Sequence, residues 1–304
     1  MRGNDVARGA GAAVLAVGLA VGLTGCWGQP GFGPLHQGAN PIEDHLTVAN
    51  VATLDVAWTA HVDDGPVRSD PVVSGPGLVH VSDDEGVYGL AAGTGARRWR
   101  TQVVPAGQPD EVVPTPVSTE GDRVHVAWGG APDTGGRSVF AATTGAPVAA
   151  AAGLGVEALT LRDPWLVTTF SGFVEGTVAG AGIGVEGPTR WGLTFGLEVG
   201  PKLPTPTGPA VTTDRVYVGI DRSWFGNDLL AGWDLAPGCV NIPQPPLCVP
   251  QVKAQLDGRP TGPVIADGEQ TVYVATDAGT VYALNADTGA VRWKASMVPP
   301  AEAT

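Results

Sequence analysis

Residues 283–293 read Ala-Leu-Asn-Ala-Asp-Thr-Gly-Ala-Val-Arg-Trp, and this stretch decides which fold the sequence predicts. The Thr-Gly pair marks a tight turn, because Gly289 can adopt the positive φ that such a turn requires. The turn delivers Trp293 on the strand that follows. Three short β-rich runs precede the turn and are separated by Gly, Asp or Asn: residues 263–265, 272–274 and 281–284. Together these runs predict a four-stranded antiparallel meander.

The same order of runs recurs along the chain. Further copies begin at Pro71, Pro116 and Pro209, and residues 159–191 contain a weaker unit, so the sequence has about five blade-like units. In most copies the second strand alternates Val with an aromatic or His residue, which gives the sheet two apolar faces. A single sheet cannot cover both of its faces. The predicted fold is therefore all-β, a β-propeller of four-stranded antiparallel blades stacked around an axis.

Tryptophans recur on the outermost strands of these units. A tryptophan on the outermost strand is a large apolar side chain that can dock against the next unit. We therefore expect the blade-docking residues to be Trp58, Trp99, Trp191 and Trp293.

The composition fits a protein of many short strands and excludes one class of partner. The 304 residues include 45 glycines and 27 prolines, and 43% are hydrophobic, which is typical of short strands joined by turns. The formal net charge is −13, and the basic residues form no cluster. Because nucleic-acid binding depends on clustered Lys and Arg, we predict no nucleic-acid partner.

The N-terminus carries an export signal. Arg2 and Arg8 precede an uncharged apolar run from Gly9 to Leu23, which is typical of a signal peptide over residues 1–25. The site Leu-Thr-Gly-Cys ending at Cys26 resembles the lipobox of bacterial lipoproteins, which implies lipid attachment at Cys26. An ordinary secretory peptide with an incidental cysteine is the alternative. Lipidation would anchor the protein to the outer face of the bacterial cytoplasmic membrane, or to another envelope membrane.

The remaining domain boundaries follow from composition. Residues 26–45 are rich in Gly, Pro and Gln and predict a flexible tether, and residues 46–304 form the predicted propeller domain. Cys239 and Cys248 lie in a Pro-rich insertion, and outside the cytoplasm such a close pair predicts a disulfide. No metal site is predicted, because the histidines lie far from these cysteines: His36, His45, His61, His80 and His125.

Three further groups of residues have a functional and a structural interpretation. Residues 83–85, Asp-Asp-Glu, could recruit Ca²⁺, but we expect a solvated turn that repels edge pairing. His80 and His125 occupy the slot that Tyr fills in other copies, so we expect packing residues. Trp224 and Phe225 could contact a sugar or peptide ligand, or pack beneath the cysteine loop.

Residues 283–293 closely resemble the tryptophan-docking repeat of pyrroloquinoline-quinone-like (PQQ-like) propellers, and residues 90–99 resemble it less closely. Residues 40–54, followed by Trp58, resemble the N-terminal lead-in of such proteins. The resemblance spans about residues 40–298 and implies one of two kinds of protein. Some members are quinoprotein dehydrogenases that oxidise alcohols or sugars. Others bind no quinone and act as assembly scaffolds, sensor ectodomains or peptide binders.

The residues favour the second kind. A quinone with three carboxylates needs several Arg or Lys and a Ca²⁺ site, and many relatives carry a disulfide between adjacent cysteines. Here Cys239 and Cys248 are not adjacent, and the chain after residue 25 has 17 − 2 = 15 basic residues. We predict no catalytic residues, no metal and no cofactor, and a protein or peptide partner for a membrane-anchored scaffold. A PQQ-dependent dehydrogenase is the alternative, and a hydrolase or lyase would need an axial cluster of acidic and His residues.

The number of units raises the question of ring closure. Relatives have more blades, and often an N-terminal strand completes the last of them. Residues 55–61, with Trp58, resemble such an outer strand, yet the last unit already has its own outer strand at Trp293. We therefore expect an incomplete ring and a truncated member of the family. In the alternative, five units close tightly and the first strand adds to an edge.

Overall fold

A computed structural model describes most of the repeat region and two segments that precede it. It covers residues 29–38, 46–63, 65–103, 113–131, 134–153, 156–162, 165–170, 173–178, 189–194, 205–221, 228–235, 250–262, 264–267 and 270–297. The strands form five antiparallel sheets, which confirms the predicted all-β fold and the five blade-like units. In the part of the chain that the structure describes, the one helical element is the 3-10 helix η1 (Val51–Thr53), and no helix there has the length and hydropathy of a membrane span.

The first two blades are regular four-stranded meanders. Blade 1 consists of β1 (Val72–Ser74), β2 (Leu78–Ser82), β3 (Gly86–Ala91) and β4 (Arg97–Gln102). Blade 2 consists of β5 (Val113–Glu120), β6 (Arg123–Ala131), β7 (Thr134–Ala141) and β8 (Pro147–Gly153).

The other three blades follow the same order. Blade 3 consists of β9 (Val156–Arg162), β10 (Trp165–Phe170), β11 (Phe173–Val178) and β12 (Thr189–Thr194). In blade 4, β13 (Thr205–Pro206) and β14 (Ala210–Val211) pair one after the other with β15 (Arg215–Asp221), and β16 (Leu229–Asp234) and β17 (Val252–Gln255) follow. Blade 5 consists of β18 (Ile265–Asp267), β19 (Thr271–Ala275), β20 (Thr280–Asn285) and β21 (Val291–Ser296).

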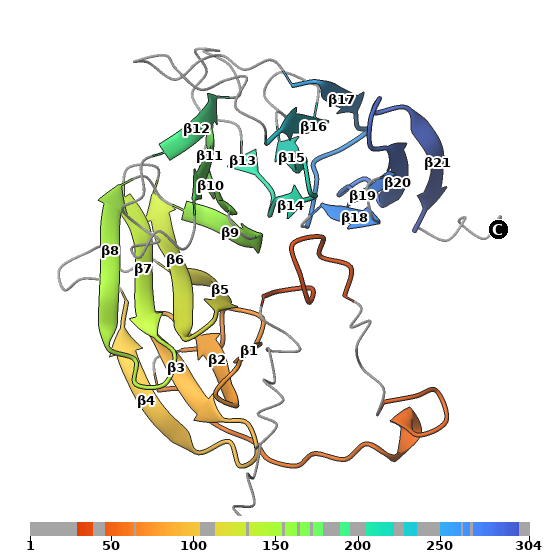
Figure 1. Ribbon diagram of the computed structural model, residues 1–304. Coiled ribbons are helices and arrows are strands. Elements are labelled where there is room, and N and C mark those ends of the chain that lie inside the picture. Colours follow the sequence, from red (N-terminus) through yellow and green to blue (C-terminus); the bar gives the residue numbers. More distant parts are fainter. Residues whose placement is uncertain are drawn as a thin grey trace, which may run out of the picture.

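The blades follow one another in chain order around an arc, with the first strand of each blade on the inner side and the last on the outer side (Figure 1). The arc is open, and blades 5 and 1 do not meet (Figure 1). The five described blades therefore form an incomplete ring.

The hydrophobic core consists of layers between neighbouring blades. Between blades 1 and 2, Val72 and Val87 pack with Val124 and Val126. Between blades 4 and 5, a larger layer includes residues from both sheets: Tyr217, Leu230, Val252, Val264, Val272 and Leu284. The alternation that gives each central strand two apolar faces thus produces one packing layer on each side of it.

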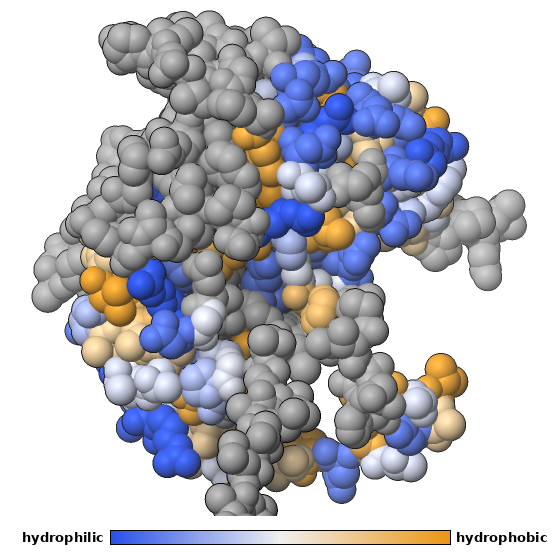
Figure 2. Space-filling model, in the orientation of Figure 1, coloured by the Kyte–Doolittle hydropathy of each residue, from blue (hydrophilic) through white to orange (hydrophobic). Residues whose placement is uncertain are grey.

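The outer faces of the two end blades differ. The face of blade 1 that looks away from blade 2 is covered by Trp58 and Val62, which pack near Val81, Tyr88 and Leu90. On blade 5, by contrast, every residue of β21 is exposed. Apolar side chains are also exposed in the N-terminal arm around η1, seen at the lower right of Figure 2: Leu46, Val48, Val51, Leu54 and Val56.

Candidate functional site

A ten-residue segment before the propeller, residues 29–38, docks on the inner side of the arc beside blades 3, 4 and 5 (Figure 1). We call it the N-terminal turn. At its start, the buried side chain of Gln29 makes two hydrogen bonds with the backbone of Leu161 in β9. Its amide Nε2 donates to the Leu161 carbonyl at 2.8 Å, and its Oε1 accepts from the Leu161 N–H at 3.0 Å. The glutamine amide therefore pairs with this strand as a backbone peptide group would.

His36 is the second buried anchor of the N-terminal turn. Its Nδ1 lies 2.9 Å from the carbonyl oxygen of Pro30, and its Nε2 lies 2.9 Å from that of Pro209 and 3.1 Å from Oγ1 of Thr160. Burial lowers the pKa of His36, although hydrogen bonds to the Pro30 and Pro209 carbonyls oppose that shift. The ring joins the turn to blades 3 and 4.

Backbone hydrogen bonds complete the docking. The N–H of Val211 in β14 donates to the Pro34 carbonyl at 2.7 Å, and the N–H of Ala266 in β18 donates to the Leu35 carbonyl at 2.9 Å. Leu35 also packs against the core layer between blades 4 and 5. The turn itself needs glycine at Gly31, where φ is +70° and a Cβ would lie 2.9 Å from Cα of His36. These residues belong to the predicted tether, and their sequence carries no signal for this docking.

Two tryptophans cover the turn of the next blade along the chain. Trp58 donates its indole N–H to the Ala92 carbonyl at 2.8 Å, and its ring lies against Gly95, the turn glycine of blade 1. Trp99 on β4 does the same one blade further on. Its N–H donates to the Ala142 carbonyl at 2.8 Å, and its ring lies against Gly145 in blade 2.

The other two predicted docking residues are in different situations. Trp191 lies on β12, paired across the ladder with Gly176, and its side chain lies outside the described residues. Trp293 lies on β21, where no further blade follows within the described residues, and it is 48% exposed. Its ring approaches Tyr273 with centroids 5.9 Å apart.

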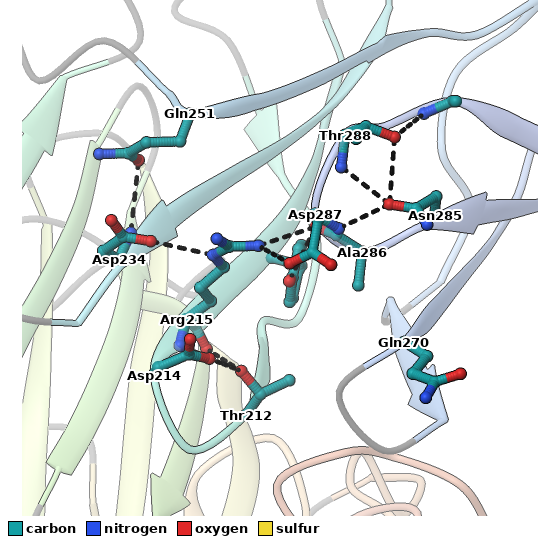
Figure 3. A network of polar contacts seen from close by, with 12 residues as sticks. Thr212, Asp214, Arg215, Asp234, Gln251, Gln270, Asn285, Ala286, Asp287 and Thr288 are labelled. Atoms are coloured by element: carbon teal, nitrogen blue, oxygen red, sulfur yellow. Dashed lines mark hydrogen bonds and ion pairs between the residues drawn. The ribbon is translucent and has the colours of Figure 1, made fainter.

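The junction between blades 4 and 5 uses an arginine instead (Figure 3). Arg215 on β15 pairs through Nε with Asp234 at 2.9 Å and through Nη1 with Asp287 at 2.7 Å. Nη1 also donates to the Ala286 carbonyl at 3.3 Å, and the buried Tyr217 hydroxyl donates to that carbonyl at 3.0 Å. Hydrogen bonds to Asp234 and Asp287 raise the pKa of Arg215, so the guanidinium keeps its charge. No sequence motif marks Arg215 as a contact residue.

The turn that Arg215 contacts is closed by hydrogen bonds to one asparagine side chain. Oδ1 of Asn285 accepts hydrogen bonds from the backbone N–H groups of Asp287 and Thr288, both at 2.9 Å, and from the Thr288 hydroxyl at 3.0 Å (Figure 3). Gly289 follows with φ of +71°, and a Cβ there would lie 2.5 Å from the backbone oxygen of Lys253. Residues 283–293, on which the fold prediction rests, thus contain the turn through which blades 4 and 5 contact each other.

The prediction of a solvated turn at residues 83–85 in blade 1 is wrong for its first residue. Asp83 was expected to lie in a solvated turn, but it is fully buried. Its Oδ1 accepts from the N–H of Gly86 at 2.8 Å and of Glu85 at 3.0 Å, and its Oδ2 accepts from the Tyr88 hydroxyl at 2.5 Å. Asp84 pairs with Arg68 at 2.5 Å. These two carboxylates therefore bind groups of the protein itself. The described residues contain no cluster of three or more metal-ligating side chains.

His80 and His125 are both buried, as packing residues should be. Nε2 of His80 lies 2.8 Å from the Ser74 hydroxyl, its Nδ1 lies 3.3 Å from the Tyr88 carbonyl, and its ring lies 5.4 Å from that of Trp99. Burial lowers the pKa of His80 to about 4, so the ring is neutral at pH 7. A neutral, hydrogen-bonded imidazole in the blade interior stabilises packing.

Five residues singled out from the sequence lie outside the described residues. They are the lipid-attachment candidate Cys26, the disulfide candidates Cys239 and Cys248, and the candidate ligand contacts Trp224 and Phe225.

Solved structures share the fold at low sequence identity. BamB from Moraxella catarrhalis has a TM-score of 0.55 and 20% identity over 79% of this chain and 64% of its own. Two quinohemoprotein alcohol dehydrogenases also match. The enzyme from Comamonas testosteroni has a TM-score of 0.63 and 16% identity over 92% of this chain and 50% of its own. The enzyme from Pseudomonas putida has a TM-score of 0.60 and 15% identity over 90% and 48%, respectively. The chain thus spans about half to two thirds of these structures.

A family model covers most of the chain. No curated protein sequence matches. The family model described as outer membrane protein assembly factor BamB matches residues 39–151 and 186–304, which include blades 1, 4 and 5 and all but the last two residues of blade 2. The recurrent Thr-Gly turns, the docked tryptophans and this match agree on one assignment: the chain belongs to the BamB family of PQQ-like repeat β-propellers.

Proposed function

We propose that this protein is a membrane-anchored, extracytoplasmic β-propeller that binds a protein or peptide partner and does not catalyse a reaction. The observation that carries the proposal is the family match, since the matching model describes an assembly factor. A second observation supports it. The inner strands of blades 4 and 5 already hold a peptide segment, because Val211 and Ala266 donate backbone hydrogen bonds to the N-terminal turn.

The anchor is proposed to be a lipid on Cys26, on the strength of the signal-like residues 1–25 and the Leu-Thr-Gly-Cys site. Cys26→Ser removes the acceptor, so the protein should move from the membrane fraction to the soluble fraction. A control variant, Thr24→Ser, keeps a small residue in the cleavage site and should remain in the membrane fraction. If Cys26→Ser stays with the membrane, the lipid-anchor proposal is wrong.

The disulfide between Cys239 and Cys248 is proposed from their spacing in an exported chain. The chain has three cysteines. If Cys26 carries a lipid and the other two are bonded, the denatured protein should have no free thiol before reduction and two after it. Two free thiols before reduction would refute the disulfide while leaving the anchor untouched.

The partner is proposed to be another envelope protein. Cross-linking in intact cells, followed by purification of the wild-type protein and of Cys26→Ser, tests this. A partner that binds the anchored protein should cross-link to the wild type with a fixed stoichiometry. The yield of the same adduct should be lower for the released Cys26→Ser variant. No defined adduct with either form would contradict a scaffold role.

A quinoprotein dehydrogenase is the second candidate, because two of the similar solved structures are quinohemoprotein alcohol dehydrogenases. The residues fit this cofactor poorly. A quinone with three carboxylates needs several cationic side chains, whereas five of the ten arginines with described side chains pair with protein carboxylates: Arg68, Arg97, Arg100, Arg215 and Arg259. We therefore favour the binding role.

A further inference from the structure

The innermost strands of the blades are sheet edges. β9 and β18 are the terminal strands of their sheets, and β14 pairs with β15 alone. An edge strand presents backbone N–H and C=O groups that another chain can use, and many peptide-binding proteins bind their ligands in this way. In this protein, three such edges face the same side of the arc, and the N-terminal turn covers them (Figure 1).

The contacts of the N-terminal turn are those of a bound peptide. Five backbone groups of the propeller are engaged: the N–H and C=O of Leu161, the C=O of Pro209, and the N–H groups of Val211 and Ala266. The turn contributes two consecutive carbonyls, of Pro34 and Leu35, with the amide of Gln29 and the imidazole of His36. The partners from the propeller are mostly backbone atoms, so the site recognises the shape of a peptide more than its charge.

The docking is held mainly by polar contacts. Leu35 is only partly buried where it packs against the core layer between blades 4 and 5. Ordering ten residues costs conformational entropy, and each hydrogen bond, including the buried bonds of Gln29 and His36, returns only part of it because the same groups bond to water when the turn is released. Segments with few apolar contacts open locally without global unfolding. The bound and released forms of the N-terminal turn should therefore be close in free energy.

We propose that the inner edges of β9, β14 and β18 form a peptide-binding site, and that residues 29–38 are its built-in, exchangeable occupant. The ligand class is a turn-forming peptide that offers two consecutive backbone carbonyls, a side-chain amide and an imidazole. This deepens the proposed function, on which it rests, by naming the site where a partner's peptide segment would bind. Such a segment competes with the N-terminal turn for the same hydrogen-bonding groups.

The test uses a fluorescently labelled peptide with the sequence of residues 29–38 and three forms of the full chain. Gln29→Ala/His36→Ala removes both buried anchors and should release the turn, so the double variant should bind the labelled peptide saturably at one site. The wild type and Gln37→Ala, which changes an exposed residue of the turn, should bind the peptide at least about tenfold more weakly, because their own turn competes. A labelled peptide that carries the same two alanines should not bind any form.

A second form of the protein keeps the test valid if the double variant misfolds. A protease site inserted after residue 39 of the otherwise wild-type chain allows the turn to be cut from the propeller after folding. The cut protein should exchange its own turn for the labelled peptide. Failure of both the cut chain and the folded double variant to bind the peptide would overturn the proposal, and so would equally tight binding by the uncut wild type.

The outcome is separable from the test of the scaffold role. If the peptide does not bind but a defined partner still cross-links to the wild type, then the partner binds elsewhere and only the site assignment is wrong. If the peptide binds in exchange for the turn and no partner is found in cells, the peptide site stands and the scaffold role fails.

Discussion

The indole ring of Trp99 lies directly on Gly145 of the next blade, so close that a Cβ at Gly145 would lie 2.5 Å from a ring carbon. The same indole donates its N–H to the Ala142 carbonyl at 2.8 Å. Gly145 has a φ of +69°. Glycine is thus needed at this position for two independent reasons, the backbone conformation and the space occupied by the ring.

Gly145→Ala should reveal both reasons. Gly121 in the same blade is a matched control, because its φ is +58° and nothing lies within 4 Å of its Cβ position. Gly121→Ala should lower the free energy of unfolding by about 1 kcal/mol, because only the backbone is strained. Gly145→Ala must also displace the Trp99 ring and should lower it by about 3 kcal/mol. Urea denaturation of the two variants measures the difference. Equal losses would show that the indole does not rest on the turn.

Trp99 and Trp293 occupy equivalent outer strands but should respond differently to truncation. Trp99 is 8% exposed and Trp293 is 48% exposed. Trp99→Ala should destabilise the protein by about 3–5 kcal/mol, as for a buried aromatic residue, and Trp293→Ala by about 1 kcal/mol. Thermal or urea unfolding of both variants tests this. A comparable loss for Trp293→Ala would mean that β21 is covered in solution.

Arg215 should stabilise the junction between blades 4 and 5. Its side chain is 20% exposed and contacts Asp234, Asp287 and the Ala286 carbonyl. Because both carboxylates are partly exposed, Arg215→Ala should cost only about 1–2 kcal/mol. Arg259→Ala is the control, since this 58% exposed arginine pairs with Asp277 at 3.4 Å and should cost about 0.5 kcal/mol or less. High salt should reduce the difference between the two variants in lost unfolding free energy. Equal losses at low salt would contradict a stabilising role for Arg215 at this junction.

Acid should destabilise the protein through His80. The pKa of His80 is about 4 in the folded protein because the ring is buried, whereas an unfolded His titrates near 6.5. The unfolded state therefore binds more protons between these values, so the stability contributed by neutral His80 is intact above about pH 6.5 and is lost as the pH falls toward 4.

The comparison of wild type with His80→Phe isolates this contribution from those of other titrating groups. Between pH 7 and pH 4.5 the wild type should lose about 2–3 kcal/mol more than the variant, from about 1.4 kcal/mol for each pH unit below 6.5. Chemical denaturation at a series of pH values provides the measurement. Parallel pH profiles for the two proteins would show that His80 is not held neutral by burial.

The sequence predicted the parts of the fold that repeat locally. Alternation in runs such as residues 79–81 and 272–274 identifies strands, and the Thr-Gly pair before Ala290 identifies the turn between the last two strands of a blade. The turn glycines have positive φ in the structure, as at Gly95 and Gly289. The number of sheets follows directly from counting these patterns.

Long-range contacts were beyond the reach of the sequence. Nothing near Gln29 or His36 indicates that these residues dock on strands more than 120 residues further along, since their hydrogen bonds to Leu161 and Thr160 involve no repeated pattern. Asp83 was misinterpreted because a run of three acidic residues suggests a solvated turn, whereas the Tyr88 hydroxyl five residues later allows one of them to be buried. Arg215 was missed because its partners come from two different blades.

The choice between binding and catalysis is tested most directly by titrating the purified protein with pyrroloquinoline quinone in the presence of Ca²⁺ and then measuring dye reduction with alcohols and glucose in the same sample. We predict no saturable quinone binding and no substrate-dependent dye reduction, because the chain after residue 25 has only 15 basic residues and five of the ten arginines with described side chains pair with protein carboxylates. Binding of one equivalent of quinone, with dye reduction that depends on an added alcohol or sugar, would contradict the account.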